Sequence, residues 1–172
     1  MKRFSMLALL PGAVTALAQP YAFAHRTHLE LKLECARCHP AISAATAPDR
    51  TRMFSPEACG ECHGKGILDL RPAPESTVAH FSHRRHAELG NVAPVILAAI
   101  RQGRYQGEVD DRLRSDLQTA DPCQACHRGL ARSDEVTRDA LPRMGDCLVC
   151  HSNDDPPRSC LKCHASAHPA RK

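Results

Sequence analysis

The chain has 172 residues, a formal net charge of +4, an aromatic content of 3% with no tryptophan, and as many as ten cysteines and eleven histidines. A nearly balanced charge without a basic run, and so few rings for a base to stack on, exclude a nucleic-acid-binding protein. Because large rings normally dominate core packing, their scarcity indicates an interior organised around something that the cysteines and histidines hold.

The N-terminus has the parts of a secretory signal peptide. Two basic residues precede an apolar stretch over residues 5–17, and a small-x-small cleavage site ends at Ala18. We therefore expect residues 1–18 to be removed, the mature chain to start at Gln19, and the protein to be periplasmic or secreted. The apolar stretch is too short, and too broken by a Pro-Gly pair, to cross a bilayer well, so no stable membrane insertion is expected.

Every cysteine falls into one of five copies of the pattern C-x-x-C-H. An exported chain with an even number of cysteines would normally be interpreted as a disulfide scaffold, and zinc sites also use C-x-x-C pairs. Neither kind of site requires a histidine directly after each second cysteine. The five copies are Cys35-Ala-Arg-Cys38-His39, Cys59-Gly-Glu-Cys62-His63, Cys123-Gln-Ala-Cys126-His127, Cys147-Leu-Val-Cys150-His151 and Cys160-Leu-Lys-Cys163-His164.

This spacing is that of covalent c-type haem attachment. Two thiols separated by two residues each add to one haem vinyl group, and the next histidine then lies beneath the ring within reach of the iron. The sequence therefore predicts five covalently attached haem c groups, which would themselves form the interior of so small a chain. We expect a multihaem cytochrome c fold, mostly irregular, with short α-helices around a haem core and little or no β-structure. Ligation and folding are coupled in such a chain.

The histidines outside the attachment motifs are candidates for the second axial position of each iron. Four of them form a repeated F-x-H-x-x-H pattern, which begins at Phe23 and again at Phe81. A repeated paired motif beside haem sites favours iron ligation over solvated surface imidazoles. Six candidates serve five irons: His25, His28, His80, His83, His86 and His168.

The opening of the mature chain resembles the class III multihaem cytochromes of the c3 and c7 type. In that family F-x-H-x-x-H is followed by six residues and then C-x-x-C-H, and here residues 29–34 fill this interval. The resemblance implies low-potential electron transfer in the periplasm during anaerobic respiration. Over residues 81–164 it rests on the motifs and their order, since the spacing differs, and the family members carry three or four haems.

By this resemblance, the first histidine of each pair closes the first haem that follows, and the second histidine closes a later one. The implied axial pairs are His25 with His39, His28 with His63, His83 with His127, and His86 with His151. The haem on His164 is left with three candidate ligands: His168 and His80 rank equally, and Met144 third. A methionine ligand would raise the potential of that haem.

The repeated motif also divides the chain. We predict a two-haem unit over residues 19–66, a proline-containing connector over 67–77, and a three-haem unit over 78–172 with a helical insertion at 87–122. Within the insertion, residues 92–101 and 109–118 are expected to be helical. The insertion would either cap the haem on His127 or present a docking surface to a partner.

No catalytic residues are predicted, because irons closed on both faces leave no site for a substrate. We expect an electron carrier that serves redox partner proteins of unknown identity. One alternative is a haem subunit of a larger respiratory complex or filament. The other is a multihaem oxidoreductase with one open haem. Three arginines within the paired motifs would either bind haem propionates or face solvent: Arg26, Arg84 and Arg85.

Overall fold

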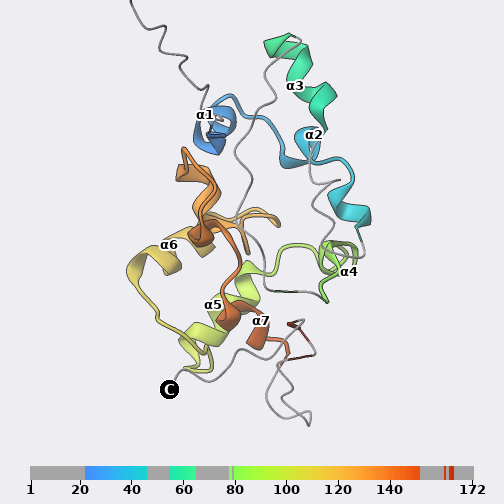
Figure 1. Ribbon diagram of the computed structural model, residues 1–172. Coiled ribbons are helices and arrows are strands. Elements are labelled where there is room, and N and C mark those ends of the chain that lie inside the picture. Colours follow the sequence, from blue (N-terminus) through green and yellow to red (C-terminus); the bar gives the residue numbers. More distant parts are fainter. Residues whose placement is uncertain are drawn as a thin grey trace, which may run out of the picture.

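The computed structural model describes residues 22–45, 55–64, 78, 80–151, 161, 163 and 164, which form short helices joined by irregular segments (Figure 1). The α-helices are α1 His25–Glu30, α2 Cys35–Cys38, α3 Pro56–His63, α4 His83–Ala87, α5 Ala93–Arg101, α6 Asp111–Thr119 and α7 Met144–Leu148; the 3-10 helices are η1 Ile42–Ala44, η3 Arg128–Arg132 and η4 Arg138–Ala140.

The predicted fold class is confirmed: these residues contain no strand, and β-structure is limited to one isolated antiparallel bridge between Val78 and His164. Across the described ranges, no helix has the length and apolar character needed to span a membrane. The predicted signal peptide, the connector over 67–77, and the site residues Cys160 and His168 lie outside the described residues.

The apolar core lies between α5 and α6, within the predicted helical insertion. Ile96 and Ile100 of α5 pack against Leu113 and Leu117 of α6, and all four are buried. Their spacing of four residues places each pair on one helix face. The core also includes Ala125, which is fully buried inside the third C-x-x-C-H motif. The insertion therefore packs directly on the third attachment motif.

Side-chain caps fix the ends of these two helices. The carboxylate of Asp110 accepts a hydrogen bond of 2.7 Å from the Leu113 amide and so begins α6. Before α5, the Asn91 side chain accepts from the Ala93 amide at 3.0 Å and donates to the Ala120 carbonyl at 2.8 Å. One amide thus ties the start of α5 to the end of α6.

The ligand-bearing helices differ from this pair, because α1, α2, α3 and α4 bury none of their residues. Helices α2 and α3 pack against each other, whereas α1 and α4 make contacts between the two predicted units. Helix α1 packs against η3, and α4 packs against η1. Figure 1 shows the first of these contacts as blue α1 beside the orange segment that precedes α7.

Truncation of the core should measure how much α5 and α6 contribute to stability. Leu113 is 1% exposed, so Leu113→Ala should lower the free energy of unfolding by about 2–5 kcal/mol. The matched control is Val95→Ala on α5, where half of the side chain is exposed and the loss should be well under 1 kcal/mol. Urea unfolding of the holoprotein, followed by far-UV circular dichroism, measures both. Equal losses would show that this core does not support the folded state.

Candidate haem-binding site

Each described attachment motif places its cysteines and histidine on one helical turn. The amide of the motif histidine donates to the carbonyl of the first cysteine in three copies, from His39 at 3.0 Å, His127 at 3.0 Å and His151 at 2.9 Å. In the second motif, His63 is the last residue of α3. Because residues four apart lie on the same side of a helical turn, the first thiol and the imidazole face one region. The described cysteines form no disulfides.

Each F-x-H-x-x-H motif forms a short helix whose histidines pack against its phenylalanine. Phe23 meets His25 edge-on at 4.7 Å and stacks on His28 at 4.5 Å between ring centroids. In the second copy Phe81 meets His83 at 4.7 Å and His86 at 4.3 Å in the same two orientations. The phenylalanine therefore fixes two imidazole planes that differ in direction. Such locked rings are what a pair of separate metal ligands requires.

The histidines of α1 face the motif histidines of the first unit. The His25 and His39 rings are nearly parallel, at an angle of 8°, with centroids 6.4 Å apart. The His28 and His63 centroids are 6.0 Å apart, with ring planes at 50°. The imidazoles that the sequence predicts to share an iron therefore lie opposite each other in both cases.

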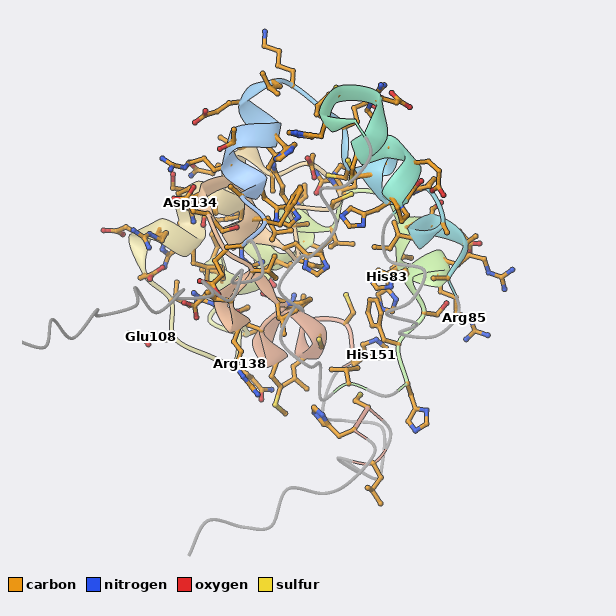
Figure 2. All side chains as sticks on the ribbon, turned by 45° about the horizontal axis from the view of Figure 1, so that its top comes forward. His83, Arg85, Glu108, Asp134, Arg138 and His151 are labelled. Atoms are coloured by element: carbon orange, nitrogen blue, oxygen red, sulfur yellow. The ribbon has the colours of Figure 1, made fainter. Side chains whose placement is uncertain are left out.

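The same arrangement occurs in the second unit. His83 faces His127 with centroids 6.5 Å apart and planes at 14°, and His86 faces His151 at 6.2 Å and 45°. Figure 2 shows His83 and His151 on one side of the molecule, with Arg85 at its outer edge. The parallel and tilted pairs thus recur in the same order in both units.

These separations fit one metal ion between each pair of rings. An imidazole nitrogen bonds a first-row metal at about 2 Å, and the ring centroid lies about 1.15 Å beyond it, so two imidazoles on opposite sides of one metal have centroids roughly 6.3 Å apart. The four observed separations run from 6.0 to 6.5 Å. Two cysteine thiols accompany each pair, as covalent haem attachment requires. Across the described residues, no three His, Cys, Asp or Glu side chains gather closely enough to hold a bare metal ion.

Hydrogen bonds orient several of these rings. The Nδ1 atom of His28 donates to the Ala24 carbonyl at 2.9 Å, and that of His86 donates to the Ser82 carbonyl at 2.8 Å. The Nδ1 atom of His127 donates to the Ala140 carbonyl at 2.9 Å. A proton held on Nδ1 leaves the lone pair of Nε2 for a metal, and second-shell bonds of this kind also fix the ring plane.

Burial keeps the inner imidazoles neutral. The pKa of His25 is lowered to about 4, first by burial and then by the neighbouring His39, His28 and His127. Burial, with His127 as a further contribution, also lowers the pKa of His39 and of His83. Because a metal ligand must be a neutral imidazole, these shifts preserve the ligating form at neutral pH.

The fifth site is described only in part. The amide of His80 donates to the Cys163 carbonyl at 3.3 Å, and the bridge between Val78 and His164 lies beside it. Residues just before the second F-x-H-x-x-H motif therefore lie next to the fifth attachment motif. Of the other two candidate ligands, Met144 is 68% exposed at the start of α7, and His168 lies outside the described residues.

Residues 21–71 match the family described as cytochrome c7 and related cytochrome c. Over these residues the chain is similar to the c7-type multihaem cytochromes. No curated protein and no solved structure gives a significant match.

The matched region holds the first F-x-H-x-x-H motif and the first two attachment motifs. The match supports a multihaem electron-transfer cytochrome with covalently bound haem c. The second F-x-H-x-x-H motif and three further attachment motifs lie beyond the match, and the ring geometry of the second unit repeats that of the first.

Sequence reasoning missed the charged residues that tie the motifs together. Arg128, directly after His127, forms a buried ion pair at 2.5 Å with Asp146, directly before Cys147. The Tyr105 hydroxyl also donates to Asp146 at 3.1 Å, and burial and this carboxylate raise the pKa of Tyr105 to about 12. The sequence offered one signal for this ion pair, which is that residues of opposite charge adjoin two attachment motifs.

The three arginines of the paired motifs have different surroundings. Arg26 binds both carboxylate oxygens of Asp134, at 2.8 Å, instead of facing solvent alone. Arg84 and Arg85 are exposed. The prediction that these side chains either bind propionates or face solvent therefore omitted a third role for Arg26, which is to join the two units.

Proposed function

We propose that the chain is a c7-type, periplasmic or secreted pentahaem protein that relays electrons between redox partner proteins through closely spaced bis-histidine haems. The proposal rests on the four opposed ring pairs, whose centroids are 6.0 to 6.5 Å apart. Location outside the cytoplasm is supported by the signal-peptide pattern over residues 1–18.

The chain's own residues do two things at each of these sites. The opposed imidazoles would hold the iron from both faces and leave no place on it for water or a substrate. The phenylalanines and the Nδ1 hydrogen bonds hold the ring planes in fixed orientations. When bound, haem supplies reversible one-electron chemistry between its ferric and ferrous states, and imidazole on both faces favours a lower potential than methionine does.

Closed sites favour an electron carrier over an enzyme. The helical insertion also bears on the alternative of a complex subunit, because its buried face packs on the third attachment motif through Ala125. The described contacts thus support a capping role for the insertion. Size-exclusion chromatography of the native holoprotein distinguishes a free carrier from a subunit of a larger assembly.

Carbon monoxide tests whether the irons are closed. The visible spectrum of the reduced holoprotein should not change on addition of the gas, because both axial positions of every haem are occupied. A change equivalent to one haem in five would place an open iron at the fifth site and favour catalysis or gas binding there. Changes at several haems would contradict the bis-histidine assignment.

Intact mass spectrometry tests the number of haems and the processing of the chain together. The purified protein should have the mass of residues 19–172 plus five covalently bound haem groups. Fewer haems would show that one of the five motifs is not used. A mass that includes residues 1–18 would contradict cleavage after Ala18 and export by this signal.

A further inference from the structure

The two units contact each other through two reciprocal pairs of segments. The backbone amide of Arg26, in α1, donates to the Ser133 carbonyl at 3.1 Å, just after η3. In the reciprocal contact, the amide of Arg84, in α4, donates to the Ala45 carbonyl at 3.0 Å, just after η1. Each ligand helix therefore packs on the segment that follows the first attachment motif of the other unit.

These contacts bring the first and third attachment sites together. The Cys35 thiol lies beside the Cys123 thiol, and His127 lies near both His25 and His39. The motif histidines of these two sites, His39 and His127, are partly buried, as expected for sites at the centre of the molecule.

Sites within each unit are also neighbours. The amide of Ser55 donates to the Cys38 carbonyl at 2.8 Å, and Arg37 of the first motif forms an ion pair with Glu61 of the second. The third and fourth motifs are joined by the buried pair of Arg128 and Asp146.

The outer sites face away from the junction between the units. The second and fourth motif histidines, His63 and His151, are exposed, whereas those of the first and third sites are partly buried. Beyond the fourth site, only residues 152–159 separate His151 from the fifth motif at Cys160, and the Cys163 thiol lies near the Cys147 thiol. The fifth site therefore adjoins the fourth.

We propose that the five haem sites form an unbranched row in the order second, first, third, fourth, fifth, and that the two units meet through the first and third sites. The order in space thus differs from the order along the chain. In such a row, loss of the first or third site separates the second site from the fourth and fifth. Loss of the second site only shortens the row.

The inference rests on the proposed bis-histidine ligation, and a spin label placed at a single haem tests the order. In the reduced holoprotein, His28→Ala should let nitric oxide bind at the second site and create one unpaired electron there. His83→Ala should do the same at the third site. Nuclear magnetic resonance then ranks the other haems by the broadening of their methyl signals, which falls steeply with distance from the spin. The carbon monoxide adduct of each variant is diamagnetic and supplies the reference linewidths.

With the spin at the second site, broadening should decrease in the order first, third, fourth, fifth. With the spin at the third site, the first and fourth haems should broaden most. Stronger broadening of the fourth or fifth haem than of the third by a spin at the second site would overturn the row. The ligand assignment is tested separately, because it fails only if a variant binds neither gas.

Discussion

Replacement of His25 by alanine should open one haem of the first unit to carbon monoxide. The His25 ring lies 6.4 Å from that of His39, centroid to centroid, and its buried Nδ1 has no hydrogen-bond partner within the described chain. The reduced His25→Ala holoprotein should bind one equivalent of carbon monoxide, whereas the unaltered protein should bind none at this site. Gas titration followed by the visible spectrum gives the stoichiometry.

The matched control is Thr27→Ala, an exposed position on the same helix, which should leave all irons closed. A second variant, His25→Met, keeps a ligand of different chemistry at this position. It should raise the midpoint potential of one haem in a redox titration, because methionine ligation favours the ferrous state relative to imidazole. If His25→Ala and Thr27→Ala behave alike, His25 is not an axial ligand.

Replacement of Asp146 by alanine should destabilise the holoprotein far more than the same change at Asp134. The side chains of Arg128 and Asp146 are 8% and 3% exposed, and those of Arg26 and Asp134 are 51% and 61% exposed. Breaking a buried pair leaves an uncompensated charge and costs about 3–5 kcal/mol. Breaking an exposed pair costs about 1 kcal/mol or less.

Urea unfolding of both variants, followed by circular dichroism, tests this difference, and the double variant Arg128→Met/Asp146→Leu extends the test. Because the double variant removes both charges, it should recover much of the stability that Asp146→Ala loses. Equal losses in Asp146→Ala and Asp134→Ala would show that the Arg128 ion pair is not buried in the holoprotein.

The parts of the site that could be predicted from the sequence are those encoded within a few residues. One helical turn links the first cysteine to the motif histidine, so C-x-x-C-H specifies its own geometry. The F-x-H-x-x-H repeat likewise indicated which histidines act in pairs. The apolar run over residues 92–101 indicated a helix, which the structure places at Ala93–Arg101.

Contacts between distant segments could not be predicted, because single polar residues carry no periodic pattern. Arg26 and Asp134 are separated by 108 positions, and nothing in either neighbourhood indicates the other. Arg128 and Asp146 adjoin two motifs, but their burial depends on how α7 packs against the insertion. The ligand of the fifth haem could not be predicted for the same reason. His80 lies next to Cys163 in the structure but far from it in the sequence.

The long-range contact of Arg26 also constrains the order of events as the chain folds. Closing a loop of 108 residues costs entropy before any contact offsets it, and such non-local topologies form slowly. Because synthesis proceeds from the N-terminus, the segment at Ser133 and Asp134 becomes available long after α1. The first two haems can thus be attached while their unit still lacks its partner surface. The attachment motifs of the N-terminal unit should consequently remain accessible for haem attachment until the C-terminal half packs against α1.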